Sequence, residues 1–268
     1  MLYFLEYSNS HQKKNNFAKI RMLRKTGIFI LLISAALFGC RTHYSVTKKE
    51  ARHQDLKSAP SSQKFDSIIA PYKNKLGNEM EKQLVMCTGD LTKDGAETTL
   101  GNFVCDAMKW VYDSLTIQNE KAIVLMNRGG LRATISKGMV TVNSIFEVMP
   151  FDNELEYVVI KGKELEDIIK RIIEKKHAFN GMIIHADKNG EYAATCDGQG
   201  IVADATYGLL CADFVVGGGD GFTFGQNLVS EKKFGITIRD CMINYCKHLK
   251  YLGKTISPYK DGRFEISK

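Results

Sequence analysis

The chain has 268 residues and a formal charge of +7 at pH 7, and both values depend on its N-terminal segment. Residues 1–39 contain six basic residues and one acidic residue, so removing them lowers the formal charge by 5, to +2. The basic character therefore does not predict binding to DNA or RNA. Residues 64–268 are long enough to fold around one sizeable core, and they contain no internal repeat.

The N-terminal segment has the layout of a bacterial lipoprotein signal. Arg24 and Lys25 precede an apolar stretch over residues 27–38, which is followed by Gly39 and Cys40. We expect the thiol of Cys40 to carry a lipid that anchors the protein to a membrane outside the cytoplasm, in the bacterial periplasm or on the cell surface. An uncleaved anchor is the alternative, although the apolar stretch is short for a membrane span.

The sequence therefore predicts three parts of the chain. Residues 1–39 form a signal region, and Met22 is a second candidate start that would place residues 1–21 upstream of the protein. Residues 40–63 are polar, which favours a flexible tether over a charged helix. Residues 64–268 form the folded domain.

In the first half of this domain, the apolar pattern alternates between helical and strand spacing. Residues 65–82 have helical spacing interrupted by Pro71 and Gly77, so we predict a helix with a break. The stretch 100–115 places six apolar residues on one face, which predicts a core helix with Trp110 in the core. Two apolar runs are the predicted strands, 83–87 and 122–126.

The second half contains two more helices, two strands and a hairpin. The hairpin turn, residues 187–190, lacks the acidic ladder of a calcium-binding loop. Because a hairpin joins antiparallel strands, it argues against an all-parallel sheet, and we predict an α+β fold. In chain order the elements are a strand 157–161, a helix 164–176, the hairpin strands 181–185 and 191–194, a strand 207–216 and a helix 236–249.

Six cysteines follow Cys40, and none has the C-x-x-C spacing of a metal site. Several lie in apolar surroundings, such as Cys211, and free cysteine packs readily as a small apolar side chain. We therefore favour buried thiols over a disulfide framework, which an exported chain could form. The six are Cys87, Cys105, Cys196, Cys211, Cys241 and Cys246.

The glycine-rich run 214–222 has the most informative pattern. It places Asp220 among glycines, with Phe214 six residues before it and Phe222 two residues after it. Glycine lets the backbone adopt positive φ and approach a ligand closely, and aromatic rings stack on flat bases. A carboxylate in such a loop can accept two hydrogen bonds from a diol. The alternative interpretation is a simple turn.

Two further segments place polar or aromatic side chains beside turns. The predicted strand 122–126 runs into Asn127, and the glycine turn that follows presents Arg132. Phe151 and Asn153 follow a proline. Each has an ordinary alternative, since phenylalanine packs in cores, asparagine favours turns and arginine forms surface ion pairs.

Six short motifs occur in a fixed order along residues 64–268. They are E-T-T-L-G-N-F (97–103), D-A-M (106–108), N-R-G-G-L-R (127–132), P-F-D-N (150–153), F-V-V-G-G-G-D-G-F (214–222) and D-G-R (261–263). Their order and spacing resemble the C-terminal domain of the 5′-nucleotidase family, which includes UDP-sugar hydrolases. The resemblance implies layered sheets flanked by helices, in the order α/β/β/α.

The resemblance also implies substrate-binding roles for six residues. Phe151 and Phe214 would sandwich a nucleobase, and Asp220 would hold the ribose hydroxyl groups. Arginine suits the geometry of a phosphate or a carboxylate. Arg132 and Asn127 would contact polar groups of the substrate, and Asn153 would support its base or sugar.

The sequence departs from the family pattern in two places. Arg128 replaces the first glycine of the N-G-G-G motif, which adds a charged side chain at the rim. Residues 93–96 read K-D-G-A, where many family members carry an arginine. Phosphate contacts are therefore weakened unless Arg128 substitutes for that arginine.

The metal-binding motifs of the family are missing from this chain. The resemblance implies two-metal hydrolysis, with ligands from an N-terminal domain that has D-x-H, G-N-H-[DE] and G-H-x-H motifs. We therefore predict no catalytic residue, metal site or cofactor in this chain, and expect divalent metals in a separate metallophosphoesterase partner. The histidines lie outside those motifs and are expected to be structural or solvated: His11, His43, His53, His177, His185 and His248.

Three functions remain open from the sequence. The first is the nucleotide-recognition half of a split 5′-nucleotidase-type phosphohydrolase, which needs the separate metallophosphoesterase chain for catalysis. The second is a stand-alone surface lipoprotein that binds a nucleoside or nucleotide without catalysis. The third is a degenerate, purely structural partner.

Overall fold

The computed structural model describes residues 63–116 and 121–267. The predicted signal region over residues 1–39, the predicted lipidation site Cys40 and the predicted tether as far as residue 62 lie outside the described residues. No helix among the residues that are described is long and apolar enough to cross a membrane.

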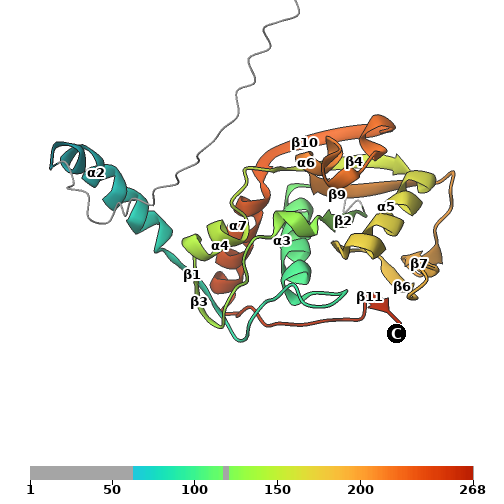
Figure 1. The fold of residues 1–268 in the computed structure, drawn as a ribbon, viewed down its shortest axis with the longest axis horizontal. Helices are drawn as coiled ribbons and strands as arrows, with labels where there is room; N and C mark the ends of the chain where they lie inside the picture. The colour runs from blue at the N-terminus through green and yellow to red at the C-terminus, as the bar shows by residue number, and fades with distance from the viewer. Residues whose placement is uncertain (1–62, 117–120, 268) are drawn as a thin grey trace, which may run out of the picture. The chain divides into compact units, whose positions relative to one another are not determined.

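A mixed five-stranded sheet forms the centre of the domain (Figure 1). All four residues of its strand β2 are buried, so side chains cover both faces of the sheet there. Within this sheet, as described, β2 and β9 are the one parallel pair, which confirms the α+β prediction and the argument against an all-parallel sheet. The strand order is β10 (Ser230–Thr237), β4 (Glu154–Lys161), β9 (Thr206–Ala212), β2 (Ile123–Met126) and β5 (Ala178–Asn180).

Two smaller sheets lie beside the central one. The predicted hairpin is present as β6 and β7, which pair antiparallel. The C-terminal strand β11 adds to β6 in parallel. The smaller sheets consist of β1 (Gln83–Cys87) with β3 (Gly138–Thr141), and of β11 (Phe264–Ile266), β6 (Ile183–Ala186), β7 (Tyr192–Cys196) and β8 (Gln199–Gly200).

Helices pack on the central sheet, and the end of one of them places His177. Helix α3 (Thr99–Leu115) packs on β2 and β5 and also contacts α7 (Ile238–Tyr251). Helix α5 (Gly162–Lys175) packs on β4 and β9. The residue that caps its C-terminus, Lys176, has a left-handed backbone with φ of 55°. This turn directs the next residue, His177, toward the edge of the sheet where β5 begins.

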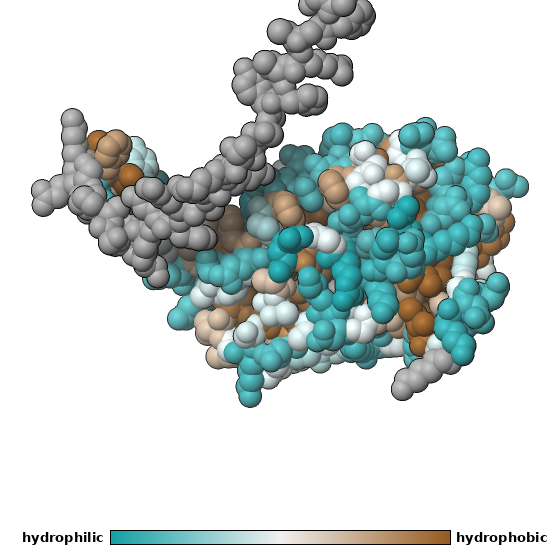
Figure 2. Space-filling view, in the orientation of Figure 1, coloured by the Kyte–Doolittle hydropathy of each residue, from teal (hydrophilic) through white to brown (hydrophobic). Residues whose placement is uncertain are grey.

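Helix α2 (Gln63–Met80) differs from the others because its apolar residues are exposed (Figure 2). The break predicted at Pro71 and Gly77 is wrong, since both residues lie inside one helix. Proline has a φ close to the helical value, so it removes one hydrogen bond without ending the helix. The exposed apolar side chains of α2 are Phe65, Ile68, Ile69, Tyr72 and Leu76.

Two other predictions need correction. The strand predicted over residues 207–216 ends at Ala212, and the short helix α6 (Asp213–Val216) follows it. The Asp213 carboxylate accepts the Phe214 N–H at 2.7 Å, which favours a turn over continued pairing. Trp110 packs against the core, as predicted, but it is only partly buried, and its ring stacks on His248 at a centroid distance of 4.5 Å.

The sequence pattern missed several elements. β10 carries charged residues at its exposed edge, and α4 (Val142–Val148) is too short to show a helical period. The described cysteines are all free thiols, and five of these six are buried, as predicted. Burial raises the pKa of the Cys241 and Cys246 thiols to about 12, so both stay protonated.

The first and last motifs of the domain meet in a polar network, the C-terminal clasp (Glu97, Asp106, Tyr259, Asp261 and Arg263). The Glu97 carboxylate accepts the backbone N–H groups of Asp261 at 2.8 Å and Gly262 at 3.0 Å. Arg263 donates to Asp261 at 2.7 Å and 2.8 Å and to the Tyr259 hydroxyl at 3.1 Å, and that hydroxyl also bonds to Asp106. These motifs therefore tie the C-terminus to the start of α3.

Candidate functional site

Three strand ends bring the predicted site residues to one edge of the central sheet. β2 and β9 are parallel with Val124 opposite Leu210, so Asn127 and Phe214 follow their carboxyl ends. β4 runs antiparallel to β9, and its first residues pair near Ala212. Asn153, which precedes β4, therefore lies at the same edge. Loops at the ends of strands commonly carry binding residues on a rigid scaffold.

Asp220 and Asn127 meet directly at this edge. The Asn127 Nδ2 group donates to the Asp220 carboxylate at 2.7 Å. Asn127 is buried, whereas Asp220 is exposed and so keeps lone pairs for a ligand. Asp220 has a left-handed backbone with φ of 52°, between Gly218 and Gly221, which also have positive φ. Such a conformation in a non-glycine residue is unusual and often marks a functional position.

The predicted base-stacking residues are both exposed aromatic side chains. Phe151 is 42% exposed and Phe214 is 45% exposed, whereas Phe222 and Phe224 on the same loop system are buried. The Phe214 ring lies against Gly219, where an added Cβ would come within 2.3 Å of the ring. A glycine is therefore required at this position for the ring to lie over the loop.

The loop that carries Phe151 and Asn153 is held from α7. Arg239 donates to the Phe151 carbonyl at 3.1 Å, forms an ion pair with Asp152 and lies 4.1 Å from the centroid of the Phe146 ring. The Asn153 carbonyl accepts the Ile238 N–H at 2.9 Å. These bonds fix the backbone of the loop, and the role of the Asn153 side chain stays a prediction.

Three cations contact the turn that follows β2, and a fourth, Lys260, lies beside the stretch 93–95; we call the four the basic cluster (Lys93, Arg128, Arg132 and Lys260). Lys93 donates to the Leu131 carbonyl at 2.7 Å, Arg132 to Gly129 at 3.3 Å and Lys260 to Asp94 at 3.3 Å. Arg128 donates to the Lys93 carbonyl. These hydrogen bonds are all to backbone carbonyls, and within the described residues none of the four forms an ion pair with a carboxylate. Uncompensated cations of this kind attract anions.

The position of Arg128 bears on the departures from the family pattern. Its side chain reaches the Lys93 carbonyl, so its guanidinium lies at the stretch 93–96, where an arginine of the family pattern is missing. The Arg128 Nη1 atom is buried and has no hydrogen-bond partner. The arrangement is consistent with Arg128 supplying that charge from a different position in the sequence.

His177 also lies at this site, and the sequence did not predict its presence there. It is 2% exposed, and its Nδ1 atom accepts the Arg128 N–H at 3.0 Å. Burial lowers the pKa of His177 to about 4, and the Asp220 carboxylate opposes that shift. No sequence motif marks this contact, because 49 residues separate the two partners.

The other described histidines have local roles. His185 pairs with Glu265 at 3.3 Å on the surface, and His248 stacks on Trp110. Across residues 63–116 and 121–267, no group of three or more His, Cys, Asp or Glu side chains could hold a metal ion.

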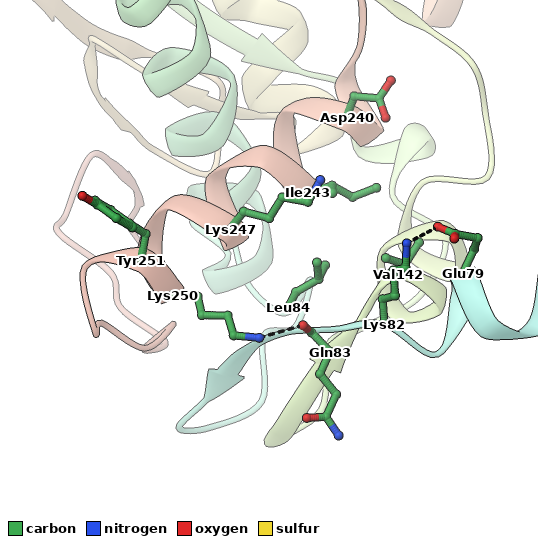
Figure 3. Close-up of a pocket in the computed structure, with 10 residues that line it drawn as sticks. All are labelled: Glu79, Lys82, Gln83, Leu84, Val142, Asp240, Ile243, Lys247, Lys250 and Tyr251. Atoms are coloured by element: carbon green, nitrogen blue, oxygen red, sulfur yellow. Dashed lines mark hydrogen bonds and ion pairs between the residues drawn. The ribbon is translucent and has the colours of Figure 1, made fainter.

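A groove of about 810 Å³ lies elsewhere, between the end of α2, β1 and α7 (Figure 3). Lys250 donates to the Gln83 carbonyl at 3.1 Å across it, and Lys82 pairs with Glu79 at 2.6 Å. None of the six predicted site residues lines this groove. We place the candidate site at Asp220, because the predicted site residues follow the strand ends there and not at this groove.

Comparison with known proteins agrees with this fold. The family model described as "5′-nucleotidase, C-terminal domain" matches residues 83–226, which is more than half of the chain. The chain therefore belongs to the 5′-nucleotidase C-terminal domain family. The matched region contains Asn127, Asp220 and both exposed phenylalanines.

Relatives of known sequence or structure are considerably longer. An apyrase from Tabanus yao is 27% identical over 199 residues, which cover 64% of this chain and 35% of the apyrase. Protein UshA from Yersinia enterocolitica is 31% identical over 140 residues, covering 49% of this chain and 26% of that protein. A 5′-nucleotidase precursor from Thermus thermophilus superposes with a TM-score of 0.64 at 25% identity, covering 78% of this chain and 44% of that structure. The chain thus spans less than half the length of these relatives.

Proposed function

We propose that this chain is the nucleotide-recognition half of a split 5′-nucleotidase-type phosphohydrolase that acts in nucleotide catabolism or salvage. The single observation that carries the proposal is the convergence of three chemistries at one edge of the sheet. Two exposed phenylalanines, the Asp220 carboxylate and the basic cluster match the base, the sugar and the phosphate of a nucleotide. The family assignment supports the same substrate class.

Each part of the nucleotide has a counterpart with suitable chemistry. Phe151 and Phe214 offer exposed aromatic faces for stacking on a base. Asp220 has free acceptor positions for ribose hydroxyl groups, and Asn127 orients its carboxylate. Arg132 and Arg128 provide charge and donors for a phosphate, for which the planar guanidinium is well suited.

Catalysis in this proposal requires a second chain. Two-metal hydrolysis of a phosphate ester needs ions about 3.5–4 Å apart, held by several fixed ligands. No such ligand set occurs in the part of the chain that the structure describes. The divalent metals would come from a metallophosphoesterase-domain partner, toward which the bound nucleotide presents its phosphate. We also propose that the chain reaches this partner as an extracytoplasmic lipoprotein anchored through Cys40.

A second candidate function is a stand-alone nucleoside- or nucleotide-binding surface lipoprotein. The observation that favours it is that the base, sugar and phosphate counterparts all belong to this one chain. Binding would then occur without a partner, and no hydrolysis would follow. A purely structural partner is a weaker candidate, because it has no use for the exposed Phe151 and Phe214.

Nucleotide hydrolysis by the purified chain tests the proposal. With added Mn²⁺, Zn²⁺ or Co²⁺, the chain alone should release no phosphate from a nucleoside 5′-monophosphate, and turnover should appear when a metallophosphoesterase partner is added. A gene for such a partner beside that of this chain would identify the protein to add. Binding that never leads to hydrolysis favours the stand-alone binder. Robust turnover by the chain alone, abolished in Asp220→Ala, would contradict the split enzyme.

A further inference from the structure

His177 connects the two loops that form the sugar side of the candidate site. Its Nδ1 atom accepts the N–H of Arg128, in the turn that follows Asn127. Its ring packs on Phe222, two residues after Asp220, with 5.3 Å between the ring centroids. The same side chain therefore contacts the turn after β2 and the loop that carries Asp220.

The contact with Arg128 fixes the protonation of the ring. Because a backbone N–H can only donate, the Nδ1 atom of His177 must be unprotonated, and the proton of the neutral ring lies on Nε2. Four charged groups act on the ring: Asp220 favours its cation, whereas Arg171, Lys175 and Arg128 oppose it. A neutral ring leaves the negative charge of Asp220 available to a ligand.

Two buried polar atoms at this point have no hydrogen-bond partner within the described residues. They are the Nε2 atom of His177 and the Oδ1 atom of Asn127. Asp220 can only accept, so the Asn127 amide must face it with Nδ2, which leaves Oδ1 free. Both residues are 2% exposed. Buried polar atoms without a partner are rare, and they are often found where a ligand or an ordered water completes a site.

We propose that His177 is a specificity-determining positioning residue, which holds the turn at Arg128 under Asp220 so that the carboxylate selects ligands with vicinal hydroxyl groups. This inference rests on the proposed function, since the vicinal diol is that of a ribose. A carboxylate binds a diol with one hydroxyl on each oxygen, so its orientation must be fixed. Asn127 sets that orientation directly, and His177 holds the turn that follows Asn127.

The central experiment is a calorimetric titration of the purified chain with matched nucleosides. The four common ribonucleosides are compared with their 2′-deoxy counterparts, and the ratio of the two affinities is the readout. A nucleoside lacks the phosphate, so the basic cluster does not affect the ratio. For the wild type we expect a preference for ribonucleosides of about tenfold or more, because the 2′-hydroxyl bonds to a charged acceptor.

Substitutions of His177 separate positioning from packing. His177→Asn keeps an acceptor at the δ position for the Arg128 N–H, so the ribose preference should persist. His177→Phe fills a similar volume without an acceptor, so the preference should fall to within about twofold of unity. Thermal unfolding shows whether each variant is folded.

A second pair of variants removes the same bond from its donor side. Arg128→Pro eliminates the backbone N–H, and the backbone of Asn127, with φ of −69° and ψ of 132°, is compatible with a following proline. Arg128→Ala removes the side chain but keeps the N–H. We expect the ribose preference to be lost in Arg128→Pro and retained in Arg128→Ala. This comparison remains informative if His177→Phe fails to fold.

The possible outcomes discriminate between the two proposals. If the wild type binds no nucleoside and no nucleotide, the proposed function fails and this inference fails with it. If the wild type prefers ribonucleosides and folded His177→Phe or Arg128→Pro keeps that preference, the inference alone is overturned. An equal loss of preference in His177→Asn and His177→Phe would also overturn it, because the δ acceptor would then have no effect.

Discussion

The candidate site and the C-terminal clasp are both built from polar residues, but their polar atoms differ in how completely they are hydrogen-bonded within the chain. In the clasp, Glu97 accepts two backbone N–H groups and Arg263 donates to Asp261, Tyr259 and the Phe179 carbonyl. In the site, by contrast, three buried atoms have no described partner: Asn127 Oδ1, His177 Nε2 and Arg128 Nη1.

The backbone and the apolar residues show the same contrast. Asp220 has positive φ and lies in an exposed loop, and the Phe151 and Phe214 rings are nearly half exposed. A buried polar atom without a partner destabilises the folded state, and so does a strained backbone. The polar atoms of the clasp are hydrogen-bonded within the chain, whereas three of the site are not. We infer that a bound group completes the site. We therefore expect changes in the clasp to alter stability, and changes in the site to alter binding.

The largest expected effect comes from breaking the clasp with Arg263→Ala. Arg263 is 7% exposed, and its removal leaves the partly buried Asp106 carboxylate without its cation. Loss of one partner from a buried ion pair lowers the free energy of unfolding by about 3–5 kcal/mol. Urea unfolding measures this change. Lys121→Ala removes an ion pair with Asp197 on the surface, so its effect should stay below about 1 kcal/mol. A loss for Arg263→Ala as small as that of Lys121→Ala would contradict the role of the clasp.

The second prediction concerns pH. The pKa of His177 is lowered to about 4 in the folded protein, compared with about 6.5 in an unfolded chain. Between these values the unfolded state binds more protons, so stability falls as the pH decreases from 6.5 to 4 and this contribution is constant below 4. The loss amounts to about 3 kcal/mol. Arg263 lowers the pKa of Asp261 from 3.8 to about 2 in the folded protein, so the stability that Asp261 contributes is present above about pH 3.8 and is lost as the pH falls from 3.8 to 2.

Thermal unfolding as a function of pH measures both windows. In His177→Asn the loss between pH 6.5 and pH 4 should be reduced, because the titrating ring is absent. An unchanged pH profile for that variant would show that another group titrates in this range.

The third prediction separates binding from stability at the exposed rings. Base stacking on an aromatic ring contributes about 1–3 kcal/mol, so Phe214→Ala should weaken nucleoside binding by roughly one to two orders of magnitude. Its free energy of unfolding should change little, because the ring is 45% exposed. Phe222→Ala is the matched control, since its ring is buried and its removal should destabilise the fold by about 3–5 kcal/mol. Normal nucleoside affinity in Phe214→Ala would reject stacking on this ring.

The smallest expected effect concerns the phosphate. Arg128→Ala and Arg132→Ala should each weaken binding of a nucleoside 5′-monophosphate by about tenfold and leave the matching nucleoside within about twofold, because only the phosphate needs these cations. The loss should decrease at high salt, which screens exposed charges. Equal losses for nucleotide and nucleoside would place these arginines near the base or sugar.

The sequence predicted the parts of the molecule that depend on local pattern. Glycine spacing around Asp220 and the apolar run before Asn127 identified both loops, and strand ends at one sheet edge bring them together. The end of β9 was missed because Phe214, Val215 and Val216 suit a strand, whereas the Asp213 side chain favours a turn. His177 and Lys260 were missed because their contacts join residues far apart in the sequence.

The roles of the end motifs also needed the structure. The pattern of Glu97 and of Arg263 supported the family resemblance, but no pattern shows that these two residues belong to one network that stabilises the C-terminus. A sequence motif indicates that a residue is required, and only its contacts distinguish binding from stability.

Nucleotide binding at this edge of the sheet is tested most directly by a calorimetric titration of the purified chain with nucleoside 5′-monophosphates, for the wild type and for a Phe151→Ala/Phe214→Ala double variant. We expect saturable binding by the wild type without any partner. In the double variant the affinity should fall at least tenfold, at unchanged unfolding temperature. No binding by the wild type, or equal affinity in a folded double variant, would contradict the claim that this edge of the sheet binds nucleotides.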